Sequence, residues 1–366
     1  MAASTSRRPP EFELALECCS GSFRDVRKPP GPLAREVDWA RFARLVAFHR
    51  VEGLAGTFLA GNDLGAPCEL VEALSEAAAS IARRNLEAAA DCRALLESFE
   101  HAGVPLLFVK GLPLGALAYR KPSVKAAIDV DLLIDPGDLR PASNLLRDCG
   151  YRLSAPRQSQ NDTALSHWHK GWKESVWTKA EPRLQIDLHT RLTDNPRLLP
   201  TIDVHSPPQW VDIGNGIRLP TLAAEENFAY VAVHGAWSAW FRLKWISDFA
   251  GLIHGRTGEE IDHLYRRSIE LGAGRCSGQG LLLADRLFGT LNEAPRLREL
   301  LKQDRTIAQL CSAALRLLTR DPQEPTATPL GSLPIRRTQF SLLPGLGYKL
   351  SELAGQAYRV LNRPPR

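Results

Sequence analysis

Two acidic residues stand two positions apart, with one valine between them, in the otherwise apolar run Ile128–Ile134. In a β-strand, alternate side chains point to the same face, so Asp129 and Asp131 would project together, with Cα atoms about 6–7 Å apart. Carboxylates this close repel each other, and burying them without compensation costs free energy. A divalent cation such as Mg²⁺ removes that repulsion and also binds phosphate oxygens. The spacing therefore fits a metal site, and it also fits two acids at a strand end that face water.

A third acid, Asp187, lies in a second strand-like run, Leu184–His189. If this strand pairs beside the first, three carboxylates gather in one place. Such a cluster can hold two metal ions about 3.5–4 Å apart, the arrangement that clamps an in-line phosphoryl displacement. The alternative is a strand-end acid that pairs with a nearby arginine or histidine, and His189 lies two residues on, on the same face.

A Lys-Gly pair, Lys110 and Gly111, stands between an apolar run and a short helical pattern. A helix N-terminus presents free N–H groups and partial positive charge, which favours phosphate. Glycine permits close backbone approach and the lysine adds a cation, although the pair is not a Walker A loop. Lys125, four residues before Asp129, is a further candidate phosphate ligand, and an exposed loop lysine is the alternative.

Other polar residues have structural interpretations. His167 and His169 alternate with tryptophans in Ser166–Trp172, which predicts a strand with two different faces. No cysteine flanks them at zinc-ligand spacing, so we expect no zinc site there, although either histidine could contact a phosphate or an acceptor. Lys244 and Asp248 are four residues apart, as in a helix-surface pair. His234 stands in the same later helical region.

The elements that must position these residues follow from the hydrophobic pattern. Strand-like runs alternate with short helices between residues 101 and 220, which indicates an α/β unit. Helical periodicity without Gly or Pro covers Leu70–Glu100. We therefore expect an N-terminal helical region at 1–100, the α/β core at 101–220 and a C-terminal helical region at 221–320. A Pro-rich linker and a basic C-terminal helix and tail occupy 321–366, with the helix at Leu346–Leu361.

Composition limits the class of protein. The 366 residues carry 24% charged and 44% hydrophobic side chains, which is typical of a globular chain. No apolar run reaches 18 residues, and the N-terminus has no secretory pattern, so no membrane partner is expected. Seven scattered cysteines without a CxxC pair favour a reducing cytoplasm. The whole net charge of +5 stems from 331–366, which argues against a nucleic-acid groove and leaves anionic substrates open.

In their order, these features resemble the nucleotidyltransferase superfamily that includes DNA polymerase beta and the aminoglycoside nucleotidyltransferases. The chain is more closely similar to the bacterial group labelled uncharacterised nucleotidyltransferase family proteins. Besides the Lys-Gly turn and the Asp129–Leu133 run, the resemblance is carried by Tyr119, Lys125, Asp187-Leu188-His189, His234-Gly235-Ala236, Arg242–Asp248 and Leu342–Arg366. Two positions depart from the group's pattern: Lys125 stands where an arginine is expected, and Thr190 stands where a tryptophan is expected.

The resemblance implies a fold and an activity. The fold is an α/β (α+β) nucleotidyltransferase core with a mixed sheet, flanked by N- and C-terminal helical segments. The activity is transfer of a nucleoside monophosphate from an NTP, ATP among them, to a peptide, protein or small-molecule acceptor, with release of pyrophosphate. The cofactor is Mg²⁺ or Mn²⁺, and no stable nucleic-acid complex is expected.

The resemblance also implies roles for the residues named above. Asp129 and Asp131 would hold the metals, and Asp187 would share one and act as base or orienter. The nucleotide ligands would be Lys110, Gly111, Lys125 and His189. Because two positions depart from the pattern, a second hypothesis stays open, in which the same fold serves as a catalytically inactive nucleotide sensor or helper subunit.

Overall fold

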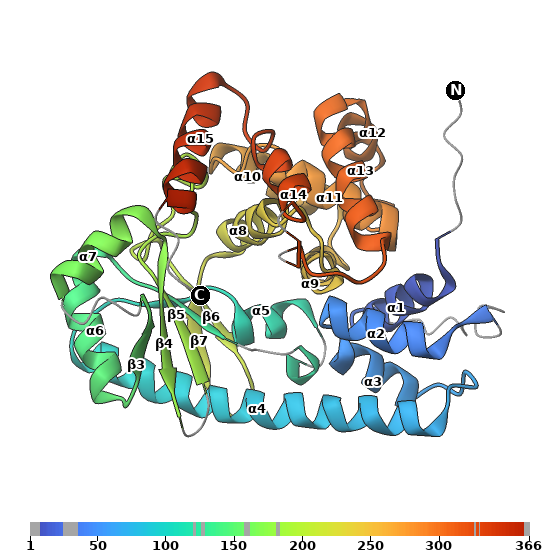
Figure 1. Ribbon diagram of the computed structural model, residues 1–366, viewed down its shortest axis with the longest axis horizontal. Coiled ribbons are helices and arrows are strands. Elements are labelled where there is room, and N and C mark those ends of the chain that lie inside the picture. Colours follow the sequence, from blue (N-terminus) through green and yellow to red (C-terminus); the bar gives the residue numbers. More distant parts are fainter. Residues whose placement is uncertain are drawn as a thin grey trace.

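The computed structural model of the chain describes residues 8–24, 36–119, 122–125, 129–156, 162–180, 184–325, 327–328 and 330–361. A mixed sheet lies at one end of the molecule and helices from both parts of the chain lie beside and above it (Figure 1). In this part of the chain no helix is both long and apolar enough to cross a membrane.

The main sheet has five strands in the order β1-β2-β5-β4-β3. Their bounds are β1 Leu107–Phe108, β2 Val130–Leu133, β3 Arg152–Ala155, β4 Glu174–Lys179 and β5 Leu184–His189. Strands β2 and β5 are parallel, whereas the other three pairs are antiparallel. A separate antiparallel pair consists of β6 Gln209–Asp212 and β7 Arg218–Thr221. The mixed sheet expected from the sequence is confirmed.

Fifteen α-helices surround these strands within the described ranges. They are α1 Pro10–Ser20, α2 Trp39–His49, α3 Glu52–Ala60, α4 Cys68–His101, α5 Gly111–Ala118, α6 Leu139–Asp148, α7 Asp162–Gly171, α8 Ala224–Trp237, α9 Leu243–Ile253, α10 Gly258–Glu270, α11 Cys276–Phe288, α12 Pro295–Gln303, α13 Arg305–Thr319, α14 Leu333–Gln339 and α15 Leu346–Leu361. The helix predicted at Leu70–Glu100 is α4, and the one predicted at Leu346–Leu361 is α15.

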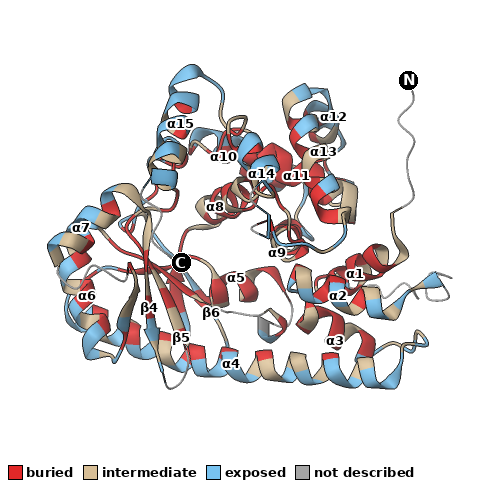
Figure 2. Cartoon of the chain, viewed as in Figure 1, coloured by how far each residue is buried: buried red, intermediate tan, exposed pale blue. Residues whose placement is uncertain are grey.

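Two hydrophobic clusters fix the sheet between helices. The smaller one joins one sheet face to α4 and α6 and includes Phe99, Leu132, Leu146 and Ile186. The larger one unites helices from both ends of the chain and receives Leu133 from the sheet. Figure 2 shows α8 mostly buried, as are strands β2 and β5, with exposed residues on the outer faces of α4 and α15. Strand alternation therefore directs Leu132 to the smaller cluster. Its neighbour Asp131 lies on the opposite face of the sheet, the face of Leu133 and the larger cluster.

Two predictions about strands need correction. The stretch Ser166–Trp172, predicted as a strand with alternating faces, lies in and just after helix α7. Leu165 and His169 are four residues apart and both buried, which is the spacing of one helix face. The strand expected in the run Ile128–Ile134 begins at Val130, so Asp129 precedes it, and residues 126–128 lie outside the described ranges.

Candidate active site

The pairing of β2 with β5 brings two of the predicted acids together. Asp131 and Asp187 are direct partners in this parallel ladder, and Leu133 is the partner of His189. One oxygen of each carboxylate and one ring nitrogen of His189 all lie within 4.8 Å of one another. Asp129, half-buried just before β2, lines the same cavity as Asp131. The four residues thus come from two neighbouring strands and the loop that enters one of them.

Asp131 is held from two sides. Its side chain is 2% exposed, and its Oδ1 atom lies 2.6 Å from Lys110 Nζ and 3.0 Å from His189 Nε2. Burial alone would raise the pKa of this carboxyl, but Lys110 and His189 lower it well below its usual range. Asp131 is therefore ionised at neutral pH.

His189 lies behind that carboxylate, with a side chain that is 0% exposed. Burial and the charge of Lys173 lower the pKa of its imidazole. Its Nδ1 atom lies 3.5 Å from Lys173 Nζ, an obligate donor, so Nε2 carries the proton and donates to Asp131. Lys173 in turn forms an ion pair with Glu174. This buried chain fixes the orientation of Asp131.

Asp187 has the opposite electrostatic character. Burial raises its pKa to about 7, and the charges of Asp131, Glu174 and Asp129 add to the effect. A hydrogen bond of 2.9 Å from Gln185 Nε2 opposes the shift without cancelling it. The carboxylate therefore has a proton affinity suited to exchange near neutral pH.

The donor set fits a divalent cation. Two carboxylates whose like charges raise the pKa of one of them, with Asp129 nearby, are the hard oxygen ligands that Mg²⁺ and Mn²⁺ prefer. The Lys110 ammonium is the cation that neutralises Asp131 in this structure. The negative charge of Asp131 is therefore already compensated by a positive group, as a divalent cation would also do.

Lys110 and Gly111 form the junction between β1 and α5. Lys110 is the N-cap residue of α5, and Gly111 is the first residue of the helix, with a φ of 61°. A Cβ atom at Gly111 would lie 3.3 Å from the carbonyl oxygen of Asp129. The backbone conformation and the close approach both favour glycine here. The turn therefore brings the start of α5 against the loop that carries Asp129.

A cavity of about 160 Å³ opens beside the acids. Asp129, Asp131 and Gly111 line one part of it, and α8 and α9 contribute further residues. The cations that line it are Arg50, Lys110, Lys125 and Lys244. Acids and cations thus face a common space, as a bound polyphosphate and its metal ions require.

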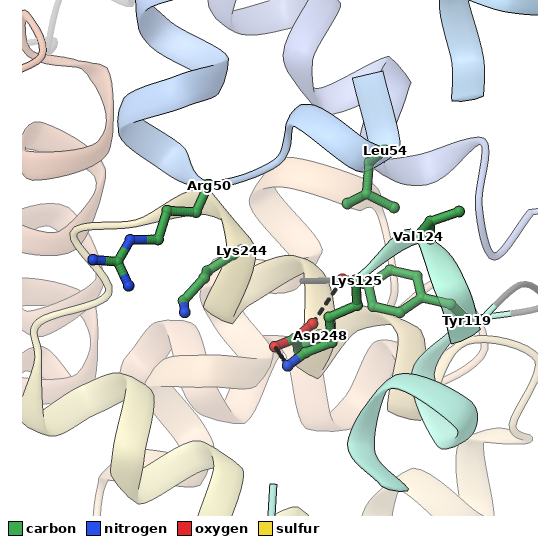
Figure 3. A pocket seen from close by; sticks show the side chains of 7 residues that line it. All are labelled: Arg50, Leu54, Tyr119, Val124, Lys125, Lys244 and Asp248. Carbon is green, nitrogen blue, oxygen red and sulfur yellow. Dashed lines mark hydrogen bonds and ion pairs between the residues drawn. The ribbon is translucent and has the colours of Figure 1, made fainter. Parts of the chain in front are cut away.

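Two of those cations, Arg50 and Lys244, were not recognised as ligands in the sequence. Figure 3 shows their side chains beside the ion pair between Lys125 and Asp248. Burial and the nearby Lys125 charge lower the pKa of Lys244 to about 8. Arg50 follows α2, far from every motif, so the sequence carries no local signal for it. Lys244 lies in the Arg242–Asp248 motif, and this motif was the sequence signal from which its place in the cavity could have been inferred.

The surface pair predicted for Lys244 and Asp248 is wrong. Asp248 is 2% exposed and binds elsewhere: Tyr119 donates to its Oδ1 at 2.8 Å, and Lys125 Nζ lies 3.3 Å from its Oδ2. The i, i+4 spacing is correct, but the helix face that carries the two residues is covered. The contact anchors Lys125, which would otherwise be an exposed loop lysine.

The three histidines with open roles lie in different surroundings. His169 is buried, with ring nitrogens 3.0 Å from Thr190 Oγ1 and 3.1 Å from Ser175 Oγ, and burial lowers its pKa to about 4. His167 is exposed on α7. His234 lines the cavity, and burial lowers its pKa well below the usual value.

Comparison with known proteins gives one family. A model of the family described as "Uncharacterised nucleotidyltransferase" matches residues 35–289, well over half of the chain. The matched span includes every residue placed in or around the cavity above. Comparison with curated proteins finds no match, and comparison with solved structures finds none either.

Proposed function

The chain belongs to this nucleotidyltransferase family, and from that premise we propose that it transfers a nucleoside monophosphate from an NTP to an acceptor nucleophile. The acceptor is a hydroxyl or comparable group on a peptide, a protein or a small molecule, and pyrophosphate is released. One observation carries the proposal: Asp129 and Asp131 line a cavity whose other polar lining is largely cationic, and Asp187 lies beside Asp131 on the neighbouring strand. A triphosphate with its metal ions needs both kinds of residue: acids that bind the metal ions and cations that bind the phosphates.

The cationic wall binds the triphosphate in this proposal. Arg50, Lys125 and Lys244 supply positive charge, and Lys110 and Gly111 supply a cation and the start of helix α5. Asp248 and Tyr119 hold Lys125 in position. The ion pair with Asp248 holds Lys125 in place before a nucleotide binds, so little ordering of this side chain is needed on binding.

The acidic wall holds Mg²⁺ or Mn²⁺ through Asp129, Asp131 and Asp187. When bound, the cation supplies electrostatic stabilisation of charge on the transferred phosphoryl group and the leaving pyrophosphate. His189 and Lys173 keep Asp131 oriented and ionised through their buried hydrogen bonds.

The transfer replaces one bond to the α-phosphorus with another. A lone pair on the acceptor oxygen forms a bond to the α-phosphorus, and the bond from that phosphorus to the bridging oxygen breaks as pyrophosphate leaves. Asp187 takes the acceptor proton, since burial and its acidic neighbours favour the protonated carboxyl there more than at Asp131. The helical segments, rather than the sheet, select the acceptor.

The test is pyrophosphate release from each of the four NTPs with Mg²⁺ or Mn²⁺ and candidate acceptors. Asp131→Asn and Asp187→Asn should each lower the rate at least about a hundredfold, because each removes charge from the reacting centre. Asp135→Asn is the matched control: this acid follows β2 but is half-exposed and contacts His205. Tight Mg·NTP binding without any pyrophosphate release in the wild type would instead support the inactive sensor or helper subunit.

A further inference from the structure

A second and larger cavity lies among α8, α14, α15 and Trp172, which directly follows α7. Its volume is about 390 Å³, and none of its lining residues lines the cleft of the acids. Figure 1 shows α15 above α7 and α14 beside α8, and both helix pairs are in contact. The residues that carry the argument are Trp172, Trp237, Arg336, Gln339, Gln356 and Arg359.

Two indole rings give this cavity flat apolar walls. Trp172 stacks on Trp168 with ring centroids 5.0 Å apart and an interplanar angle of 11°. On the other wall, the guanidinium of Arg359 lies 5.5 Å from the centroid of the Trp237 ring. Each contact covers one face of its ring and fixes its orientation, so a planar group of a ligand would stack on the opposite face.

The polar wall carries net positive charge. Glu352, 1% exposed, accepts from Arg359 at 3.1 Å and from Gln356 at 2.9 Å. These bonds fix Arg359 and offset its charge. Arg336, by contrast, is exposed at the cavity wall and forms no ion pair with any residue that the structure describes. A ligand with a negative group would find its counter-charge at Arg336.

One face of helix α8 links this cavity to the cleft of the acids. His234 lines the cleft, and together with Trp237 it lines a small intervening cavity of about 30 Å³. Trp237 also lines the large cavity. Successive residues of an α-helix rise 1.5 Å, so His234 and Trp237 are about 4.5 Å apart along the axis. A molecule in the large cavity could therefore extend a nucleophile along α8 toward the acids.

We propose that this cavity is the acceptor site, and that it takes a group that joins a planar ring to a negatively charged substituent. The ring stacks on the indoles and the negative group pairs with Arg336. Two sources carry this chemistry, an aromatic carboxylate and a nucleoside monophosphate. The inference rests on the proposed function, because an acceptor site is needed here only if the cleft of the acids holds an NTP from which a group is transferred.

The test measures binding of charged and neutral probe pairs by calorimetry, using the full chain with Mg²⁺ and α,β-methylene-ATP to fill the cleft. The pairs are indole-3-acetate with indole-3-acetamide, and AMP with adenosine. In at least one pair, the anion should bind the wild type about tenfold more tightly than its neutral partner, as expected for one charge-assisted contact. The pair that shows the contrast identifies the source.

Arg336→Gln should reduce that ratio to near one, and the substitution of an exposed side chain leaves the fold intact. Arg337→Gln is the matched control, since this neighbour is also exposed but does not line the cavity. Trp172→Ala should weaken binding of the anion and of its neutral partner by the same factor, because it removes a stacking face and no charge.

Three results would overturn the inference while leaving the proposed function standing. They are equal binding of anion and neutral partner in both pairs, an unchanged ratio in Arg336→Gln, and displacement of the probes by α,β-methylene-ATP. Binding of the analogue itself is measured on the same samples. If the analogue does not bind but the anions still show the Arg336 dependence, the proposed function fails, and the acceptor role fails with it.

Discussion

Lys244 gives a pH dependence that can be worked out from its surroundings. Burial, with Lys125 nearby, lowers its pKa from 10.5 to about 8, and its side chain lines the cationic cleft. A bound triphosphate favours the charged form and restores a higher pKa. Below pH 8 the lysine is protonated with or without nucleotide, so affinity does not depend on this group. Above pH 8 binding requires uptake of a proton, and affinity falls as pH rises.

The expected magnitude follows from one proton. The dissociation constant of Mg·α,β-methylene-ATP should rise with a slope that approaches about tenfold per pH unit above 8, which gives about sixteenfold between pH 8 and 9.5. Lys244→Arg should abolish this dependence, because a guanidinium stays charged throughout that range. The assay is calorimetric titration across pH 7–9.5, with Lys302→Arg as control, since Lys302 pairs with Glu299 on the surface. The same pH slope in Lys244→Arg and wild type would refute the reasoning.

Two further predictions concern the residues that shape the cleft. Gly111→Ala should lower the free energy of unfolding in urea by about 1–2 kcal/mol, because φ is 61° and the new Cβ approaches the Asp129 carbonyl; an unchanged midpoint would contradict this. Tyr119→Phe should cost about 1 kcal/mol of stability, since Asp248 loses one hydrogen bond, and should raise the KM for NTP by loosening Lys125. A stability loss with unchanged KM would show that Lys125 keeps its position without Tyr119.

The sequence predicted the parts of the site that depend on local pattern. Strand periodicity placed Asp131 and Asp187 on strands with apolar neighbours, and the Lys-Gly pair marked the start of a helix. Their meeting depends on the parallel register of β2 and β5, which no local pattern specifies. The resemblance to a family was needed to place the two strands side by side.

What the sequence could not predict depends on long-range packing. Arg50 reaches the cleft because the end of α2 contacts a segment far along the chain: His49 accepts from the Leu243 N–H, and the Phe48 carbonyl accepts from Arg242. Asp248 has the spacing of a surface residue and becomes buried only when Tyr119 and Lys125 cover it. In α7, alternation of His and Trp over a few residues fitted a strand, but a strand would place His167 on the same face as Leu165 and His169. Those two are buried and His167 is exposed, as a helix requires.

The central claim is that the acids of β2 and β5 bind a divalent cation together with the nucleotide. Titration of Mn²⁺ into the protein with α,β-methylene-ATP, followed by electron paramagnetic resonance of the free ion, tests it most directly. We predict tight binding by the wild type and by Asp135→Asn, and a loss of at least about tenfold in affinity for Asp131→Asn and Asp187→Asn, since each removes a ligand charge. Equal Mn²⁺ affinity in all four proteins would contradict the account.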